Sequence, residues 1–594
     1  MENCKIKNIL KSILNYKKEL LIGNSFALLS TLLTVTIPLF IPMLIDDLLL
    51  HKKPKLTPYV DAIFGHMSLI GYVTFFLILT IIMRFLGVIF ANLQVKMLLS
   101  VSKDISFKLR ESATKHLKRV ALKEYERFSP GAITSKLVTD IETVDSFIGT
   151  TVGKLIISTL ILIFTSIILL LINWKLALFI LVTNPIVVYF TAKLARRVGK
   201  LKKAENKAIE AFQVKLNDTL EHFNQIKAAN KEDYFFGKII NKAKELKDIS
   251  IEFSYKSDRA IRVSFFTFLS GYEVFRAVSI LAVAYSNLSI GLMLAIFGYL
   301  WIMMTPTQDI INFQYALFNA NGACERINEI FKLQQERVVS NGKDPFISSG
   351  VEIELKNLNF GYSSENLILK DINLIIKKTK KVAIVGPSGS GKSTIANLIA
   401  GFYEPNSGDI KYNSISFKDI DPSKIRKNIY LILQHPKLFN DTMRFNLTLG
   451  KYFSDTQIKE ALKIAQIDDL VESLDNKLES IIGKDGVKLS GGQRQRVAIA
   501  RMLLANPKCV IFDESTSALD VHTEINLFRD LKEFLKDKTV ITIAHRLSTI
   551  ESAEYVFVLE DGKLVDSGTP KELFKKDSGY FARMIWVSFA LQNI

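Results

Sequence analysis

The run Gly386-Pro387-Ser388-Gly389-Ser390-Gly391-Lys392-Ser393-Thr394 decides how the second half of this chain is interpreted. It follows an apolar, β-branched stretch at 381–385, predicted to be a buried strand, and it precedes an apolar helical pattern from Ile395. Glycines let backbone N–H groups curl around phosphates, and the start of the next helix adds partial positive charge. Lys392 supplies a full charge to the β- and γ-phosphates, and the Ser393 hydroxyl suits Mg²⁺. The stretch therefore predicts a nucleoside-triphosphate site.

Two acidic residues follow a second predicted strand, at 509–512. We expect Asp513 to enter the Mg²⁺ shell and Glu514 to polarise an attacking water. A further apolar strand at 540–544 leads to His545, which is placed to contact the γ-phosphate. Strands that alternate with helical patterns indicate an α/β domain.

The first half of the chain is apolar in long stretches. The whole chain has 594 residues, 48% of them hydrophobic, with a net charge of +18 and a mean hydropathy of +0.21. A single soluble domain of this size and apolarity would be unusual. About 20 apolar residues cross a bilayer as a helix. Six stretches meet that length approximately, at 20–45, 67–95, 155–174, 176–192, 263–286 and 291–308.

The lysines and arginines orient these predicted spans. They concentrate before the first span and in the connections 96–154 and 193–262, which are predicted to be helical extensions into the cytoplasm. The positive charge is thus an orientation signal, and no nucleic-acid partner is predicted. Three cysteines, Cys4, Cys324 and Cys509, exclude a disulfide framework.

Two ionisable residues lie inside the fifth predicted span. Glu273 and Arg276 are three residues apart and therefore share a helix face. Charged groups at membrane depth are costly and point to function by default. Two interpretations stay open: a structural ion pair, or a polar wall of a substrate pathway.

The run Leu489-Ser490-Gly491-Gly492-Gln493 matches the signature of ATP-binding cassette (ABC) proteins without a mismatch. Further motifs occur in the order typical of that family. Tyr362 resembles the aromatic residue that stacks on adenine, and Gln434 resembles the Q-loop glutamine. Residues 517–520 resemble the D-loop, and His545 resembles the switch histidine. The resemblance implies ATP and Mg²⁺ as cofactors, with Glu514 and His545 catalytic and Mg²⁺ held by Ser393, Gln434 and Asp513. The implied ATP-binding residues are Tyr362, Gly386, Pro387, Ser388, Gly389, Ser390, Gly391, Lys392, Ser393, Thr394, Gln434, Ser490, Gly491, Gly492, Gln493 and Asp520.

The membrane half resembles the exporter branch, in which six spans precede one cassette. The expected fold is multidomain: an all-α polytopic transmembrane domain at 1–335, a linker at 336–350 and an α/β P-loop ATPase domain of ABC type at 351–594. Two coupling helices are expected at 125–131 and 228–236. One departure precedes the signature, where the family has Gly-Glu-x-Gly and this chain has Gly483-Lys484-Asp485-Gly486. The lysine puts the usual contact with a coupling helix in doubt, and Asp485 is the alternative acid.

In this family the signature of one cassette closes the ATP site of another, so the resemblance implies a head-to-tail dimer. A homodimer is expected, with a heterodimer with another half-transporter as the alternative. The implied function is ATP-driven export by alternating access of an amphipathic small molecule or lipid, with multidrug export and lipid flipping weighted equally. A peptide exporter and, from a different class, an ATP-gated channel or regulatory membrane protein are the alternatives. The expected location is a bacterial inner membrane, with the N-terminus and the ATPase domain in the cytoplasm.

Overall fold

The computed structural model divides the chain into two compact units. It describes residues 4–50, 60–62, 65, 67–126, 130–285, 288–339, 342–363, 366–483, 486, 489–513, 520–544 and 547–576. The first unit, the helical unit, comprises Met1–Leu117 and Pro130–Lys332, and the second, the ATPase unit, comprises Lys118–Ser129 and Leu333–Ile594. The second unit thus includes a short segment from within the helical half, which was not predicted. The domain limits proposed from the sequence remain predictions.

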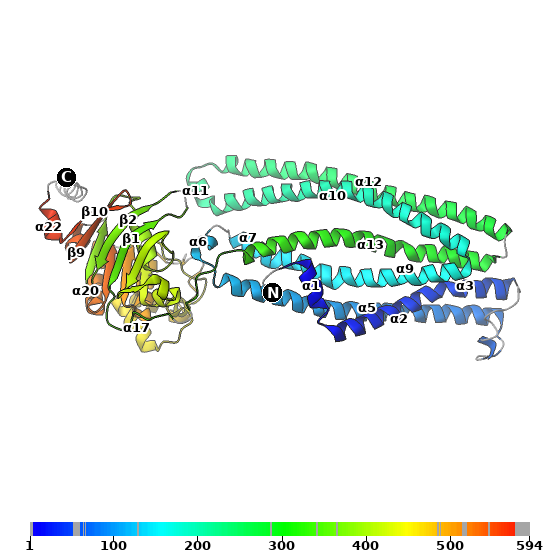
Figure 1. Cartoon of the computed structure of the whole chain (residues 1–594), viewed down its shortest axis with the longest axis horizontal. Helices are drawn as coiled ribbons and strands as arrows, with labels where there is room; N and C mark the ends of the chain where they lie inside the picture. The colour runs from blue at the N-terminus through cyan, green and yellow to red at the C-terminus, as the bar shows by residue number, and fades with distance from the viewer. Residues whose placement is uncertain are drawn as a thin grey trace. The chain divides into compact units, whose positions relative to one another are not determined.

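The helical unit is built mainly from long helices (Figure 1). Its described elements are α1 (Ile6–Ile13), α2 (Lys17–Thr36), η1 (Ile37–Leu39), α3 (Phe40–Pro42), η2 (Met43–Leu49), α5 (Leu69–Leu117), α7 (Pro130–Ser135), η3 (Lys136–Asp140), α8 (Ile141–Ser146), η4 (Phe147–Thr151), α9 (Val152–Ile172), α10 (Trp174–Glu221), α11 (Phe223–Ala228), α12 (Glu232–Tyr285) and α13 (Ile290–Phe331). Asn173 ends α9 and caps α10, because its side chain accepts hydrogen bonds from the N–H groups of Lys175 and Leu176.

Five helical stretches in the described residues are long and apolar enough to cross a membrane: Lys17–Leu49, Leu69–Leu117, Gly131–Ile172, Glu232–Tyr285 and Ile290–Phe331. Each overlaps one predicted span. The remaining predicted span, 176–192, lies within α10, where most of its side chains fall outside the described part. Helix α12 has 54 residues, or about 80 Å at 1.5 Å per residue, far more than the roughly 30 Å of hydrocarbon. The expected continuation of membrane helices beyond the bilayer is therefore confirmed.

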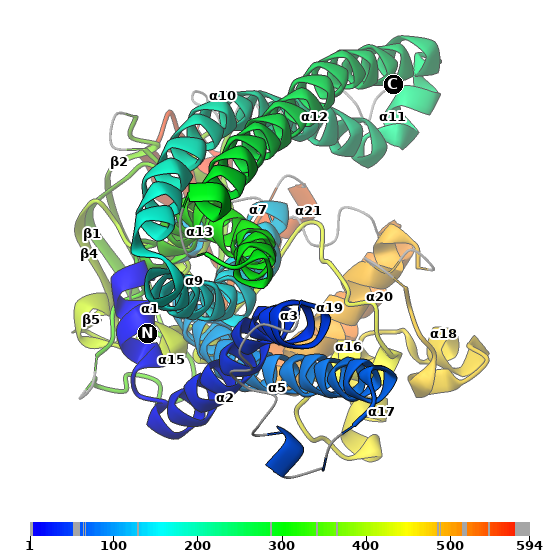
Figure 2. The ribbon, with the colours of Figure 1, turned by 90° about the vertical axis from the view of Figure 1, so that its right-hand side faces the viewer.

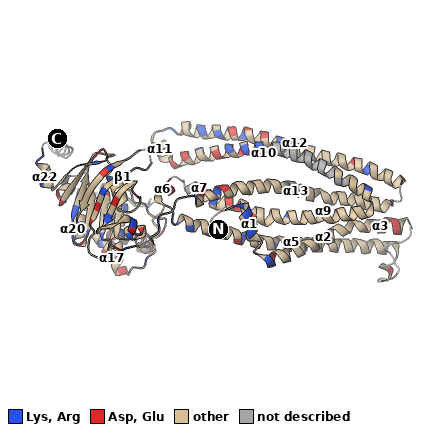
Figure 3. Ribbon diagram, viewed as in Figure 1, with Lys and Arg blue, Asp and Glu red and all other residues tan. Residues whose placement is uncertain are grey.

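The helices of this unit pack in pairs. Helix α10 lies along α12, and α2 lies along α5, in both views (Figures 1 and 2). Charged residues gather over the ends of α10 and α12 that adjoin α11 and become sparse towards the opposite ends (Figure 3). This segregation is what a membrane helix with an aqueous extension requires.

The ATPase unit contains two sheets. The strands β2 (Leu369–Ile376), β1 (Ile353–Phe360), β4 (Ser407–Tyr412) and β5 (Ile415–Ser416) form an antiparallel sheet in that order. The second sheet has the order β10 (Lys563–Gly568), β9 (Tyr555–Glu560), β3 (Lys381–Val385), β8 (Thr539–Ile543), β7 (Cys509–Asp513) and β6 (Ile429–Ile432). All its neighbours are parallel except β10 with β9. The predicted α/β class is confirmed.

Helices complete this unit: α6 (Leu122–Tyr125), α14 (Lys392–Ile399), η5 (Phe417–Asp419), α15 (Pro422–Asn428), α16 (Met443–Thr448), α17 (Asp455–Ile464), α18 (Asp468–Ser473), η6 (Lys477–Glu479), α19 (Gly491–Ala505), α20 (Val521–Leu535), α21 (Leu547–Glu551) and α22 (Pro570–Phe574). One core cluster lies between the two sheets and includes Ile353, Ile384 and Phe557. The strands β3, β7 and β8 run parallel, so their carboxyl ends share one edge, where ligands bind in open α/β sheets.

Candidate ATP site

The P-loop joins the carboxyl end of β3 to α14, and two of its glycines are required by close contacts. A Cβ on Gly386 would lie 2.1 Å from the Leu559 carbonyl oxygen, and one on Gly391 would lie 2.5 Å from Leu369 Cδ2. Gly391 also has a φ of 98°, in the left-handed region. Helix α14 begins at Lys392, three residues before the predicted start at Ile395, because the loop ends in this left-handed turn.

The P-loop side chains leave polar groups ready for an anion. Lys392 is buried, and its Nζ donates to the carbonyl oxygens of Gly386 (3.0 Å) and Pro387 (2.8 Å). Ser390 is also buried, and its Oγ has no hydrogen-bond partner among the described groups. A buried hydroxyl without a partner costs free energy unless a ligand supplies one. These features fit a phosphate group.

An oxygen-rich site lies next to the P-loop. The Ser393 Oγ donates to Asp513 Oδ1 at 3.1 Å, which joins the start of α14 to the end of β7. Gln434 follows β6, and Ile432 pairs with Phe512, so Gln434 and Asp513 leave the sheet at the same edge. Mg²⁺ prefers oxygen ligands and is often bound through one or two carboxylates plus substrate phosphates. The donor set fits Mg²⁺.

The signature run begins a helix whose start is prepared for an anion. The Ser490 Oγ accepts from Gln493 N–H at 3.3 Å, and Gln493 Oε1 accepts from Ser490 N–H at 2.7 Å. This reciprocal capping box fixes the first turn of the 15-residue helix α19. The N-terminal end of α19 carries the partial positive charge of the helix dipole. Gly491 and Gly492 have no side chains that would block an anion from approaching it.

Two other predicted ligands have protein partners in the chain. Tyr362 follows β1 and packs edge-on against Phe360 and Tyr403, with ring centroids 5.1 and 5.2 Å apart. Asp520 caps α20 and accepts from Thr523 N–H (2.9 Å) and Thr523 Oγ1 (2.7 Å). These hydrogen bonds lower the pKa of Asp520, the one from the side chain most. Contact of either residue with ATP remains a prediction.

Several predicted residues lie outside the described part of the chain. These are Glu514, His545, Lys484, Asp485 and the D-loop residues 517–519. The strands that lead to them are in place, since β7 ends at Asp513 and β8 at Ile543. The catalytic roles of Glu514 and His545 therefore rest on the sequence.

The segment Lys118–Ser129 is held within the ATPase unit by the chain that follows α13. Ala121 N–H donates to the Gln334 carbonyl at 3.0 Å, and Glu336 N–H donates to the Arg119 carbonyl at 2.7 Å. The Tyr403 hydroxyl donates to Glu126 Oε1 at 2.8 Å. Sequence reasoning missed these contacts, because residues hundreds of positions apart leave no local signal. The segment overlaps the break predicted at 125–131, and residues 127–129 lie outside the part of the chain that the structure describes.

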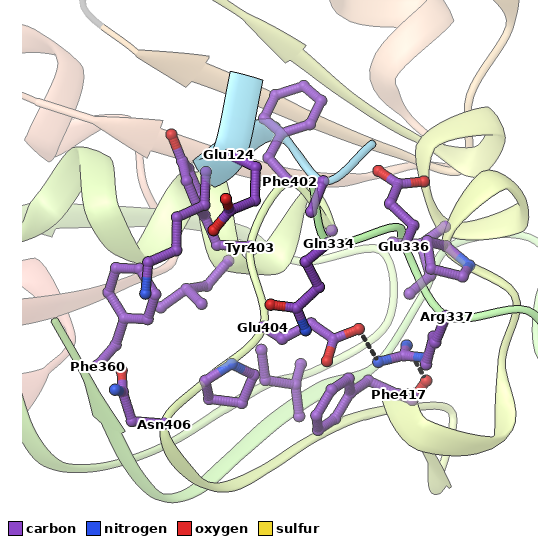
Figure 4. Close-up of a pocket in the computed structure, with 18 of the residues that line it drawn as sticks. Glu124, Gln334, Glu336, Arg337, Phe360, Phe402, Tyr403, Glu404, Asn406 and Phe417 are labelled. Atoms are coloured by element: carbon purple, nitrogen blue, oxygen red, sulfur yellow. Dashed lines mark hydrogen bonds and ion pairs between the residues drawn. The ribbon is translucent and has the colours of Figure 1, made fainter. Parts of the chain in front are cut away.

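A cavity of about 350 Å³ lies beside this segment (Figure 4). Its walls come from α6, from 334–337 and from the cassette around Tyr403. Arg337 Nη1 donates to Glu404 at 2.7 Å, and its guanidinium lies 4.5 Å from the Phe417 ring centroid (Figure 4). Arg426 makes two hydrogen bonds to Glu336, at 3.0 and 2.8 Å. The connection that follows α13 is thus anchored by arginines.

In the helical unit, Glu273 and Arg276 form an ion pair at 2.5 Å on α12, with about half of each side chain exposed. The ion pair expected under the first interpretation is therefore present. The second break, predicted at 228–236, contains Asn230 with a φ of 52°, between α11 and α12.

The fold and this site together define a membrane protein whose helical unit is joined to a P-loop ATPase. Comparison with known proteins identifies the family. The family description "ABC transporter" matches residues 369–517, and "ABC transporter transmembrane region" matches 20–307. The chain belongs to the ABC transporter family and is a half-transporter of the exporter type, an integral membrane protein that binds and hydrolyses ATP.

Individual relatives support this assignment. The chain is similar to an ATP-dependent lipid A-core flippase of Photobacterium profundum, with 31% identity over 497 residues, covering 81% of this chain and 82% of that protein. It is 31% identical over 472 residues to ABC transporter B family member 1 of Dictyostelium discoideum, covering 78% of this chain and 51% of that protein. A solved structure of a bacterial Atm1-family ABC exporter with ATP bound has the same fold, with a TM-score of 0.84, 24% identity and coverage of 97% and 98%.

Proposed function

We propose that this chain forms a homodimer that exports a lipid or an amphipathic small molecule, driven by ATP hydrolysis at two composite sites. The observation that carries the ATPase part is the contact of Ser393 with Asp513 beside Lys392. The similarity to a lipid A-core flippase over four fifths of both chains supports a lipid or lipid-like substrate.

Each residue of the site has a proposed role. Lys392 and the P-loop N–H groups neutralise the β- and γ-phosphates, and Ser390 gains a partner for its buried hydroxyl. Ser393, Gln434 and Asp513 hold Mg²⁺, which screens the phosphate charge when bound. Glu514 accepts a proton from the attacking water, and His545 contacts the γ-phosphate. Tyr362 stacks on the adenine.

The chemistry of the signature helix supports the proposed dimer. The capped start of α19 offers N–H groups and partial positive charge to a phosphate. The P-loop of the same chain offers the same kind of groups, so each chain carries two phosphate-binding elements. In a head-to-tail dimer each signature helix closes the ATP site of the other copy. We propose that Asp520 lies next to the ATP site that is closed in this way. ATP binding then favours one of two global conformations. A large shift in their populations requires ATP to bind one conformation more tightly than the other by a few kcal/mol.

The orientation is proposed from charge. Lysines and arginines at the N-terminus and in the connections favour a cytoplasmic location for these segments and for the ATPase unit. The charge gradient along α10 and α12 in Figure 3 supports this orientation. We place the protein in a bacterial inner membrane, where a half-transporter with this orientation would export its substrate.

The central test is Glu514→Gln in the full-length transporter in proteoliposomes. Loss of the base should reduce ATPase turnover by about 100-fold or more while ATP binding persists. Glu533→Gln, an exposed carboxylate on α20, is the matched control. Unchanged ATPase in Glu514→Gln would overturn the assigned role of Glu514.

The substrate is tested by measuring ATPase stimulation and transport against lipids, dyes and peptides. We propose Glu273 and Arg276 as part of the substrate pathway, since half-exposed charges at membrane depth are otherwise costly. Replacing both by alanine should lower substrate stimulation. The matched control is the double alanine variant of Glu252 and Lys256, another exposed ion pair of α12. Normal transport in the first variant removes that pair from the pathway.

A further inference from the structure

Two of the three cysteines of the chain are in contact in the helical unit, although 320 positions separate them. The Sγ atoms of Cys4 and Cys324 lie 2.7 Å apart. Both side chains are buried, with exposures of 1% and 3%. Cys4 lies two residues before the start of α1, and Cys324 lies in α13 well beyond the predicted end of the last span at 308. Neither thiol takes part in the proposed transport chemistry.

The surrounding structure fixes this pair in place. Asn328 Oδ1 accepts from Cys4 N–H at 2.7 Å, and Asn328 Nδ2 donates to the Cys4 carbonyl at 2.7 Å. Asn328 and Cys324 are one helical turn apart and share a face of α13. The apolar face of α1, with Ile6, Ile9 and Ile13, packs into the same cluster. The hydrogen bonds of its backbone with Asn328 therefore hold Cys4 against Cys324.

The number of available ligands among the described residues argues against a metal site and leaves a disulfide as the chemistry of this pair. Zn–S bonds of about 2.3 Å in a tetrahedron place two sulfurs roughly 3.7 Å apart, so the pair would have to open by about 1 Å. The described residues also contain no group of three or more His, Cys, Asp or Glu side chains that could hold a metal ion. A disulfide needs the sulfurs to approach to about 2.05 Å, a shift of roughly 0.7 Å.

We propose that Cys4 and Cys324 are an oxidation site that forms a reversible disulfide between α1 and α13 when a hydroperoxide is present. The Cys4 thiol donates a hydrogen bond to the Cys324 sulfur, and this bond, followed by burial, raises the pKa of Cys4, so the attacking group is the Cys324 sulfur in its thiolate form. It attacks the peroxide O–O bond and gives a sulfenic acid and, after protonation of the leaving oxygen, an alcohol or water. The second thiol attacks that sulfur and releases water. In sum, two thiols and one hydroperoxide give one disulfide, one alcohol and one water, and two electrons pass from sulfur to oxygen. A free thiol reverses the bond by exchange.

Access and consequence follow from the position of Cys4. Cys4 is 1% exposed and its neighbour Lys5 is exposed, so a small oxidant reaches the pair when these two residues move away from Asn328. The bond would join the chain before the first span to the last helix of the unit and close a loop of about 320 residues. Cross-links over long loops restrict the unfolded state most. The oxidised helical unit should therefore resist unfolding more than the reduced one.

The test uses the purified full-length transporter treated with hydrogen peroxide. Free thiols are blocked under denaturing conditions, and peptides are mapped by mass spectrometry without reduction. We expect a Cys4–Cys324 cross-linked peptide within one chain, with the buried Cys509 of β7 recovered as a blocked thiol. A cross-link between two chains, a bond to Cys509, or blocked thiols at Cys4 and Cys324 would overturn the proposal.

A second measurement separates the bond from general oxidative damage. Peroxide should raise the Tm of the native chain by about 5 °C or more, and dithiothreitol should reverse the shift. Cys4→Ser and Cys324→Ser should each abolish the rise, whereas Cys509→Ser should keep it. A rise that persists in Cys4→Ser, or no rise in the native chain, contradicts the proposed fastening of α1 to α13.

Discussion

The Tyr403 hydroxyl donates a hydrogen bond to the Glu126 carboxylate at 2.8 Å, across 277 positions of sequence. Burial, and then the bond to Glu126, raises the pKa of Tyr403, so the hydroxyl stays protonated and remains a donor. The same ring packs on Tyr362, the residue predicted to stack on adenine. Tyr403 thus contacts both Tyr362, at the predicted base site, and Glu126, within the predicted first coupling helix at 125–131.

Tyr403→Phe removes only the hydroxyl and keeps the ring contacts with Tyr362 and Phe360. We expect basal ATPase to stay within about twofold, whereas substrate transported per ATP should fall about two- to fivefold, since a hydrogen bond to a charged group is lost. The measurement is paired transport and ATPase in proteoliposomes. Tyr555→Phe is the control, because its hydroxyl makes an exposed hydrogen bond to Ser567. An unchanged ratio in Tyr403→Phe would show that the bond does not couple the two activities.

Ser393→Ala should weaken Mg²⁺-dependent turnover. The hydroxyl is one of the oxygens next to Asp513, and its loss removes a proposed ligand from the metal. We expect ATPase to fall roughly tenfold or more and the Mg²⁺ concentration for half-maximal activity to rise. Titration of ATPase against Mg²⁺ checks this. Ser552→Ala is the control, since this serine makes an exposed hydrogen bond to the Thr549 carbonyl. The same Mg²⁺ dependence in both variants would exclude Ser393 as a ligand.

Arg326→Ala should destabilise the helical unit. Arg326 binds the buried Asp140 through Nε (3.1 Å) and Nη2 (2.6 Å), joining α13 to η3. Truncation leaves Asp140 buried without its cation. Because Arg326 is itself half exposed, we expect a loss of roughly 1–3 kcal/mol and a Tm lower by about 3–8 °C.

Thermal unfolding in detergent measures this effect. Arg326→Lys should give an intermediate Tm, since an ammonium cannot reproduce the two-point contact. Arg262→Ala, which breaks an exposed pair with Asp258, should change the Tm little. A Tm for Arg326→Ala equal to that of Arg262→Ala would mean that the buried pair adds no stability.

Cys509 should resist alkylation in the folded protein. Burial raises the pKa of its thiol, and the thiolate is the reactive form. At pH 8.5 about half of a free cysteine is ionised, whereas Cys509 should remain a thiol throughout pH 7–9. Iodoacetamide labelling followed by mass spectrometry should therefore show no rise at Cys509 across that range until the protein is denatured. A labelling rate that increases tenfold per pH unit from pH 7 would contradict this prediction.

The sequence was sufficient wherever function depends on neighbouring residues. A phosphate loop needs its glycines, lysine and serine within nine positions, so its strand–loop–helix context could be predicted and was confirmed. The apolar length of a membrane helix is likewise a local property. The start of α14 was misplaced by three residues because the left-handed turn at Gly391, which ends the loop, is not visible in an apolar pattern.

Only the tertiary structure decided the contacts between distant segments. The bond from Tyr403 to Glu126, the pairing of Cys4 with Cys324 and the inclusion of Lys118–Ser129 in the ATPase unit join residues that no short-range pattern relates. Such contacts depend on how helices and sheets pack, which many side chains determine together. The sequence by itself determined the class of this transporter and the composition of its ATP site, since both are written in local motifs. The fold determined which distant segments of the chain are in contact with the residues around that site.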